Sequence, residues 1–227
     1  MSLAEIFYNC LIKGNAWQTV LNGLLATVEI SVLSMLSGTI IAAGICVLRM
    51  SKRAVLRVIA QMYIAMLRGS PVLLLLMLMY YVVFARSNLD AILVATVAFS
   101  LNISAHLAEL MRSSLTATDH MQAEAARTLG FSKFQAFRLI TLPQAVKIAK
   151  PMYQSNIVNL IQWTSVVGYI TITDLTRVIN NIGSRTMQPL FMICVGMILY
   201  LAMAYVTYGI FALNDKMKFA RAQREKV

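Results

Sequence analysis

Four polar residues recur along one very apolar stretch of the chain. They are spaced by four, three and four residues, which places them on one face of a helix. These residues are Asn102, His106, Glu109 and Ser113. Such a stripe must face protein or water. The Glu109 carboxylate can hold the ammonium group of a substrate, pair with Arg112 or Arg68, or stabilise a helix crossing, whereas His106 alone is better explained as a packing residue.

A second group of polar side chains lies between Gln154 and Ser165, a segment rich in amides and hydroxyls. This density is unusual for a helix in contact with lipid, so the segment is expected to line an interface or a cavity. The candidates for a polar pathway are Asn159, Gln162, Thr164 and Ser165. Hydrogen bonds between helices would explain the same residues equally well.

The remaining reactive residue types form no pattern typical of an enzyme or a metal site. Cys10, Cys46 and Cys194 are scattered, lack ligand spacing and have no pair of histidines nearby. We therefore expect no catalytic residue, no metal site and no disulfide framework. The net charge of +11 would suit nucleic acid, but the basic residues lie beside apolar runs, which membrane topology explains better.

The elements that carry these residues are expected to be membrane-spanning helices. With 59% hydrophobic residues in 227, the chain has too few polar residues to cover a soluble globule. We predict an all-α, polytopic membrane protein with one transmembrane domain over residues 1–227. The predicted spans cover residues 20–48, 55–85, 91–115, 152–172 and 189–213. Residues 3–12 are expected to form an interfacial helix on the outer face.

Lysine and arginine set the predicted orientation, because cytoplasmic loops carry their excess. Basic residues cluster after the first span, between the third and fourth spans, and in the C-terminal tail. The clusters are Arg49, Lys52, Arg53 and Arg57; Arg127, Lys133, Arg138, Lys147 and Lys150; and Lys216, Lys218, Arg221, Arg224 and Lys226. The N-terminus should therefore lie outside and the C-terminus in the cytoplasm, which requires an odd number of spans.

The loop over residues 119–150 contains a short polar helix in this otherwise apolar chain. Asp119 followed three residues later by Gln122 is a variant of the capping box, and Gly130 is a typical C-terminal cap. The residues between them are helix formers, and Ala125 and Leu129 share one face. The pattern predicts an exposed helix whose small apolar surface suits docking into a partner's groove.

Two further patterns concern the packing of helices. Small residues recur every three or four positions in the first span, which lets helices approach closely in lipid. They are Gly23, Thr27, Ser31, Ser34, Gly38 and Ala42. In the second span Gly69 and Pro71 predict a break beside Arg68, which either orders the fold or lines a pathway. The segment from Arg177 to Arg185 is expected to be an external loop that suits a soluble partner.

The polar loop resembles the EAA loop of bacterial ABC import permeases in composition and spacing. The matching residues are Glu124, Ala125, Ala126, Gly130, Ile140, Leu142 and Pro143. In that family the loop carries a coupling helix that seats in a cleft of a cytoplasmic ATPase. The resemblance therefore implies that the ATPase-coupling residues are Gln122, Glu124, Ala125, Ala126, Leu129 and Gly130. The alternative is an ordinary amphipathic surface helix.

Other segments resemble the polar amino acid permeases of this family. These segments are Arg68-Gly69-Ser70-Pro71, Tyr80-Tyr81, His106–Arg112, Gln162–Ser165 and Asp174–Arg177. Two positions depart from the family pattern, because His106 replaces the usual tyrosine and Trp163 replaces an acidic or amide residue. The structural or gating candidates are Arg68, Gly69, Pro71 and Pro143.

The resemblance implies the fold of an ABC type I importer permease that carries a polar amino acid across the bacterial inner membrane. It also implies a cytoplasmic ATPase dimer, a second permease subunit, identical or similar, and a periplasmic or lipid-anchored substrate-binding protein. Because the chain has no G-x-x-x-x-G-K-[ST] loop, ATP and Mg are expected on the ATPase, with no cofactor here. The alternatives are a permease for methionine, a metal or an opine, and an ion-coupled transporter or channel that uses Glu109 and His106.

Overall fold

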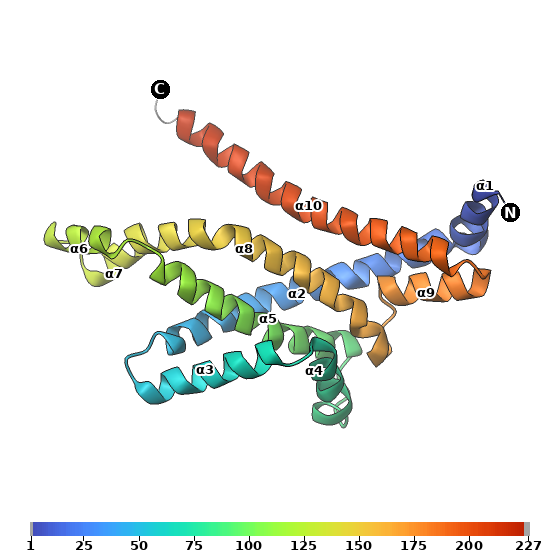
Figure 1. Ribbon diagram of the computed structural model, residues 1–227, viewed down its shortest axis with the longest axis horizontal. Coiled ribbons are helices and arrows are strands. Elements are labelled where there is room, and N and C mark those ends of the chain that lie inside the picture. The colour runs from blue at the N-terminus through green and yellow to red at the C-terminus, as the bar shows by residue number, and fades with distance from the viewer. Residues whose placement is uncertain (1, 225–227) are drawn as a thin grey trace. The chain divides into compact units, whose positions relative to one another are not determined.

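The computed structural model describes residues 2–224, apart from the side chains of Leu3 and of residues 218–224, and these residues form helices joined by short turns (Figure 1). No strand occurs among them, which confirms the predicted all-α fold. The α-helices are α1 (Leu3–Phe7), α2 (Ala16–Arg49), α3 (Ala54–Gly69), α4 (Val72–Leu78), α5 (Ala91–Thr116), α6 (His120–Thr128), α7 (Lys133–Ala136), α8 (Leu142–Trp163), α9 (Leu175–Thr186) and α10 (Pro189–Arg224). Lys226 of the predicted basic tail lies outside the described residues.

Shorter helical turns extend or join these helices. Three have π geometry, namely η1 (Tyr8–Ile12), η3 (Met79–Val83) and η4 (Phe137–Thr141), and two have 3-10 geometry, namely η2 (Lys13–Asn15) and η5 (Thr164–Ile170). Residues 3–12, which were expected to form a helix, are helical in α1 and η1.

Within the described part of the chain, three helical segments are long and apolar enough to cross a membrane. They are Ala4–Arg49, Ala91–Thr116 and Pro189–Met217. The bent pair Ala54–Gly69 and Val72–Val83 makes a fourth crossing if it is one broken span. The first, second, third and fifth predicted spans fall on these segments.

The fourth predicted span, residues 152–172, differs from the helix that the structure places there. α8 begins at Leu142, ten residues earlier, because Pro143 lies in its first turn, where a missing N–H costs nothing, and η4 leads directly into it. It ends at Trp163, and η5 continues to Ile170. α8 is not among the helices apolar enough to cross by composition alone, so this crossing stays a prediction.

The described chain forms two compact units that alternate along the sequence. The first unit contains the chain up to Leu33, from Val72 to Ala98, and from Ile157 onwards. The second unit contains residues 34–71 and 99–156. α2, α5 and α8 each contribute residues to both units.

In the first unit α9 packs along α10 (Figure 1). Its buried residues follow the spacing of an amphipathic helix and form a core with residues such as Val20 and Met192. The buried residues of α9 are Leu175, Val178, Ile179, Ile182 and Gly183. The prediction of an external loop from Arg177 to Arg185 was therefore wrong. The intervening polar residues lie on the outer face of a helix whose apolar face is buried.

The start of α9 depends on a buried acidic cap. Asp174 is fully buried and accepts hydrogen bonds from the backbone N–H groups of Thr176 (3.0 Å) and Arg177 (3.1 Å). Burial raises the pKa of the Asp174 carboxyl above its usual range, although these hydrogen bonds act to lower it. The N–H of Leu175 donates to the hydroxyl of Thr27 on α2 at 3.3 Å. The Asp174–Arg177 segment thus anchors α9 against α2.

The second unit has a close contact between α2 and α5. A Cβ at Gly38 would collide with Cγ2 of Ile103 and lie 3.1 Å from the carbonyl oxygen of Ser100. The hydroxyls of Ser37 and Ser100 share a hydrogen bond of 2.6 Å. The other members of the predicted small-residue stripe are also packed, with Thr27, Ser31, Ser34 and Ala42 buried and Gly23 against Val178 and Asp174. The packing role predicted for the stripe is confirmed.

The predicted break in the second span is also confirmed. α3 ends at Gly69 and α4 begins at Val72, which leaves Ser70 and Pro71 outside both helices. Pro71 has no N–H to donate to the carbonyl of Leu67, four residues earlier. That carbonyl instead accepts a hydrogen bond of 3.0 Å from Nδ2 of Asn102, whose side chain is buried. Asn102 therefore satisfies the backbone group that the break leaves open.

Candidate functional site

The predicted docking helix is α6, and its N-terminal cap is Asp119. The N–H of Met121 donates to Oδ1 of Asp119 at 2.9 Å. The reciprocal half of the predicted capping box was wrong, because Oε1 of Gln122 accepts from Nε2 of Gln144 on α8 at 2.7 Å. The side chain of Gln122 therefore ties α6 to a neighbouring helix and does not close its own N-terminus.

Gly130 ends α6 as predicted. Its φ is +93°, a conformation that favours glycine. The N–H of Gly130 donates to Arg127 O at 3.1 Å and the N–H of Phe131 to Ala126 O at 3.2 Å. These two bonds are those of a Schellman motif, which satisfies the last carbonyls of the helix. Both ends of α6 are thus fixed by their own sequence.

One face of α6 is apolar and exposed, as predicted. Met121 is 76% exposed and Leu129 is 80% exposed, with Ala125 also exposed between them. Glu124 and Gln122 are exposed on the flanks of this face. Ala126, in contrast, is only 4% exposed. It holds the helix in place and does not offer a contact surface.

Sequence reasoning missed the aromatic residues that follow α6. Phe134 is 68% exposed, and Phe131 and Phe137 are each about 40% exposed. They recur at intervals of three, before α7, within it and at the start of η4, and this recurrence was the signal that could have identified them. Together with Met121 and Leu129 they make the loop an exposed apolar surface, which is typical of a protein contact.

A polar pocket lies in the second unit, near the stripe predicted on α5. Its volume is about 240 Å³, and it is lined by Arg49, Gln61, Ile64, Ala65, Arg68 and Glu109. Two of these, Glu109 and Arg68, were predicted as site residues. Arg49 and Gln61 were not, because they come from α2 and α3 and only the fold brings them beside α5. His106 is half-buried one turn before Glu109.

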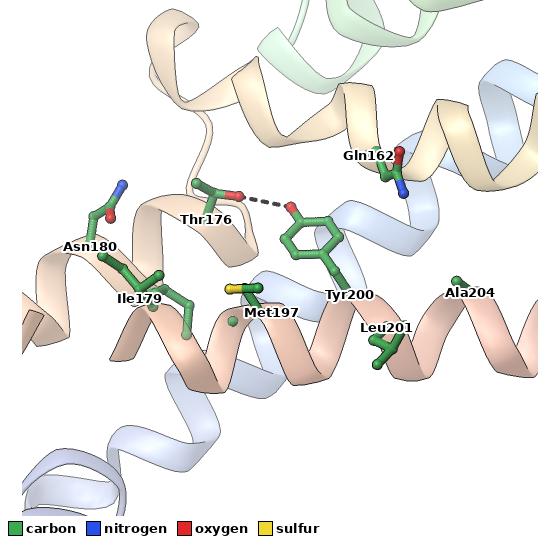
Figure 2. A pocket seen from close by; sticks show the side chains of 10 residues that line it. Gln162, Thr176, Ile179, Asn180, Met197, Tyr200, Leu201 and Ala204 are labelled. Carbon is green, nitrogen blue, oxygen red and sulfur yellow. Dashed lines mark hydrogen bonds between the residues drawn. The ribbon is translucent and has the colours of Figure 1, made fainter. Parts of the chain in front are cut away.

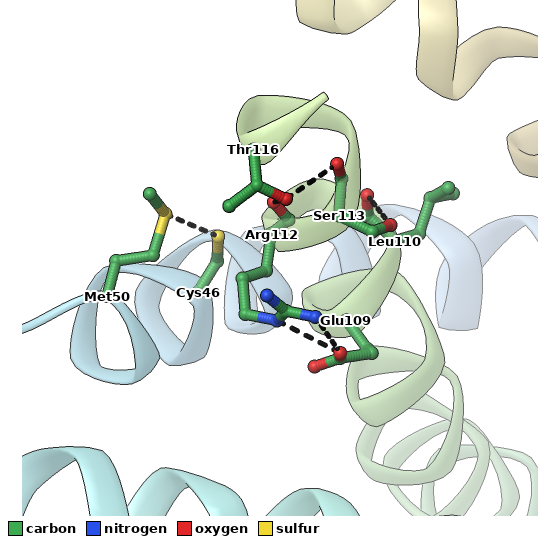
Figure 3. A network of polar contacts seen from close by, with 7 residues as sticks. All are labelled: Cys46, Met50, Glu109, Leu110, Arg112, Ser113 and Thr116. Carbon is green, nitrogen blue, oxygen red and sulfur yellow. Dashed lines mark hydrogen bonds and ion pairs between the residues drawn. The ribbon is translucent and has the colours of Figure 1, made fainter. Parts of the chain in front are cut away.

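Glu109 forms an ion pair with Arg112, one turn later on α5 (Figure 3). Nε of Arg112 donates to Oε1 of Glu109 at 2.9 Å, and a second guanidinium nitrogen reaches the same oxygen. Both side chains keep about 30% of their surface exposed. Arg49 and Arg68 act electrostatically on the same carboxylate. Two guanidinium groups, those of Arg49 and Arg68, therefore line the pocket with one carboxylate, and a third, that of Arg112, pairs with this carboxylate.

The four pathway candidates near the end of α8 lie in the first unit. Gln162 is exposed and lines a second pocket of about 360 Å³, with Thr176 and Tyr200, whose hydroxyls share a 2.8 Å hydrogen bond (Figure 2). Thr164 is fully buried, and its hydroxyl donates to the carbonyl of Ile161 at 2.7 Å. Asn159 is exposed and Ser165 is half-buried. Of these four candidates, Gln162 is thus placed at a pocket by the structure.

Tyr80 and Tyr81, which form one of the segments that resemble the polar amino acid permeases, support the turn after η5. The hydroxyl of Tyr81 donates to the carbonyl of Tyr169 at 3.0 Å, and Tyr80 lies 3.4 Å from the hydroxyl of Thr171. Thr171 has a left-handed φ of +76°, which is uncommon for threonine. The two tyrosines therefore help to hold a strained turn just before α9.

The fold combines several membrane-spanning helices, a pocket lined by charged residues and an exposed, capped helix in a polar loop. These features are typical of a membrane transport subunit. Residues 21–218 match the family described as "Binding-protein-dependent transport system inner membrane component". The chain belongs to this family, which confirms the predicted recognition. It is an inner-membrane, multi-pass permease.

Individual relatives and one solved structure agree with this assignment. The chain is 34% identical over 203 residues to the probable amino-acid ABC transporter permease protein YckA of Bacillus subtilis, covering 89% of this chain and 90% of that protein. It is 30% identical to the L-cystine transport system permease protein TcyB of the same organism, covering 81% and 79%. A crystal structure of an amino acid ABC transporter with histidines matches with a TM-score of 0.81 and 26% identity, covering 96% of this chain and 100% of that chain.

Proposed function

We propose that this chain is the transmembrane subunit of an ATP-driven importer of a polar amino acid, and that it couples to a separate ATPase through α6. The observation that carries this proposal is the capped helix α6, with its exposed apolar face of Met121, Ala125 and Leu129. A membrane protein keeps such a surface outside its spans to contact a partner. The amino acid transport named for the relatives supports the choice of cargo.

The partners of this proposal follow from the family to which the chain belongs and from its sequence. The chain carries no phosphate-binding loop, so ATP and Mg belong to a cytoplasmic ATPase dimer. A second permease subunit, identical or similar, completes the pathway, and a periplasmic or lipid-anchored binding protein delivers the amino acid. No covalent step falls on this chain, which is not an enzyme. The N-terminus lies outside and the C-terminus in the cytoplasm.

Transport requires that closure of the ATPase dimer be transmitted to the spans. Within the second unit, α6 is held by the buried side chain of Ala126 and by the hydrogen bond between Gln122 and Gln144 of α8. A displacement of α6 therefore pulls on α8. Glu109 and His106 on α5, and Asn159, Gln162, Thr164 and Ser165 near the end of α8, are the proposed contacts along the pathway.

ATP hydrolysis in nanodiscs tests this proposal directly. The chain is assembled with its candidate ATPase and partner permease, and hydrolysis is measured before and after a binding protein loaded with each amino acid is added. Stimulation by one loaded protein is expected, and it identifies the cargo. A well-folded chain that assembles with no ATPase would contradict the importer assignment.

The same preparation separates the two alternatives. If only a binding protein loaded with methionine, a metal or an opine stimulates hydrolysis, the fold and coupling stand and the cargo is corrected. An ion-coupled transporter would instead move solute in proteoliposomes that contain this chain alone and a proton or sodium gradient. We expect no transport there, because α6 would have no partner.

A further inference from the structure

The pocket beside Glu109 holds two arginines that share the charge of this one carboxylate with Arg112. Within the part of the chain that the structure describes, neither Arg49 nor Arg68 donates a hydrogen bond or lies within 4.0 Å of a carboxylate oxygen. The carboxylate of Glu109 is already engaged by Arg112. The pocket therefore keeps an excess of positive charge.

Arg68 lies near the C-terminal end of α3, far from the N-terminal end, which follows the basic loop. α3 begins at Ala54, and a rise of 1.5 Å per residue places Arg68 roughly 21 Å further along the axis. That depth is well inside a hydrocarbon core of about 30 Å. A guanidinium group at this depth is costly unless an anion, a carbonyl or water satisfies it. Glu109, the carboxylate in the lining, is already paired with Arg112, so the pocket leaves Arg68 to water or to an added anion.

The directions of the side chains converge on this pocket. Helical side chains lean towards the N-terminus of their own helix. Arg68 therefore leans back along α3 towards Ala65 and Gln61, and Arg49 leans back along α2 from its C-terminal end. Both line the same pocket with Glu109. Two guanidinium forks beside one carboxylate form a site with places for both an anionic and a cationic group.

We propose that this pocket binds the α-carboxylate of the transported amino acid through Arg49 and Arg68, with Glu109 beside it for the substrate's ammonium group. The inference rests on the proposed function and adds the group that the site recognises. Arginine suits this role because its planar fork matches a carboxylate with two parallel hydrogen bonds. The pocket volume of about 240 Å³ suits a small solute.

The site is tested by measuring the binding of amino acids directly to the assembled complex. The binding protein is left out, because it selects amino acids itself. The complex of this chain with its ATPase and partner permease is placed in phosphatidylcholine nanodiscs, and binding of tritiated standard L-amino acids is measured by scintillation proximity. L-histidine is compared with histamine, and L-arginine with agmatine, as unlabelled competitors. Histamine and agmatine lack only the carboxylate.

Arg68→Gln and Arg49→Gln are each expected to weaken binding of the amino acid by about tenfold or more, because each removes a charged donor. Arg68→Lys should keep part of the affinity. Arg57→Gln is the matched control, since Arg57 is exposed on the same helix and does not line the pocket. The amines should compete about tenfold less well than their amino acids.

Several results would overturn the site. One is an unchanged affinity for the amino acid in Arg68→Gln and Arg49→Gln, and another is equal competition by the amines and their amino acids. A third is the absence of amino acid binding to a wild-type complex whose ATPase still responds to a loaded binding protein. A lipid phosphate in the pocket would appear as less copurified phosphatidylglycerol in Arg68→Gln, with amino acid binding unaffected. Loss of the ATPase response in the wild type would instead contradict the proposed function.

Discussion

Glu109 is the residue on which the proposed pathway depends most, because it is the one carboxylate lining a pocket with Arg49 and Arg68 and is paired with Arg112. Glu109→Gln keeps the shape but removes the charge, which costs about 1.5–3 kcal/mol for a charged hydrogen bond. We expect uptake in proteoliposomes to fall by about tenfold while the ATPase still assembles.

Asp90→Asn serves as the control for that change. Asp90 is exposed immediately before α5 and accepts from the N–H of Ile92 at 3.2 Å, a bond that asparagine can also accept. Its uptake should equal that of the wild type. If Glu109→Gln transports as well as Asp90→Asn, Glu109 has a structural role alone.

Asn102 gives a prediction about stability. Its side chain supplies the donor that Pro71 cannot give to the carbonyl of Leu67. Asn102→Leu is close in volume but leaves that buried carbonyl unsatisfied, which should cost about 1–3 kcal/mol and lower the Tm in detergent. Asn181→Leu, at an exposed position on α9, should leave the Tm nearly unchanged. Equal Tm values for the two variants would show that the bond contributes little.

At the scale of residues, the sequence predicted local contacts better than distant ones. The caps of α6 at Asp119 and Gly130 depend on neighbours in sequence, and both were correct. The partner of Gln122 is 22 residues away, and its bond was not predictable from spacing. Glu109 was predicted as a site residue because a carboxylate is energetically costly in an apolar helix. Arg49 lines the same pocket only because the fold brings α2 beside α5, which the sequence did not predict.

The contact between α2 and α5 permits a paired test at the scale of elements. An added Cβ at Gly38 would collide with Ile103 and approach the backbone of Ser100, whereas at Gly44 on the same helix it would meet nothing within 4 Å. Gly38→Ala should therefore destabilise the protein by about 1–3 kcal/mol through overpacking. Gly44→Ala should be neutral or slightly stabilising, because alanine favours the helix. Thermal unfolding of both variants measures the difference.

The capped end of α6 permits a second test of an element. Gly130→Pro removes the N–H that donates to Arg127 and fixes φ far from +93°, so the Schellman motif cannot form. We expect loss of ATPase assembly and of ATP-driven uptake. Gly130→Asn is the control, because asparagine tolerates a positive φ, and it should keep most of the uptake. Full uptake by Gly130→Pro would refute coupling through α6.

At the scale of elements, the sequence predicted long apolar helices and the break at Pro71 because these depend on composition and on one missing donor. It failed at α9, where Arg, Asn and Gly suggested a loop. There, Leu175, Val178, Ile179 and Ile182 bury one face, and packing against α10 outweighs the polar residues between them. Tertiary burial of this kind has no signal in the polarity of a short segment.

The whole molecule could be assigned to its family from the sequence because the motifs of the loop and of three spans occur in the right order. The number of crossings could not be settled in the same way. α8 carries the polar residues Gln154, Asn156, Asn159 and Gln162, and polar residues lower the apolar signal by which a span is identified. The composition of α8 is thus the physical cause of the difficulty in counting spans.

The parity of the crossings offers a direct test of the whole chain. Five spans place the two ends on opposite sides of the membrane, and four place them on the same side.

In a Cys194→Ser background, which removes the exposed native thiol, Lys13→Cys and Met217→Cys each present one exposed cysteine. The basic clusters predict that a membrane-impermeant maleimide labels Lys13→Cys in spheroplasts, and labels Met217→Cys only after permeabilisation. Lys133→Cys in the loop that holds α6 should behave like Met217→Cys, because both are on the ATPase side. Labelling of both ends from the same side, with Lys133→Cys still labelled only after permeabilisation, would mean that α8 does not cross. Labelling of Lys133→Cys from outside would remove α6 from reach of any cytoplasmic ATPase.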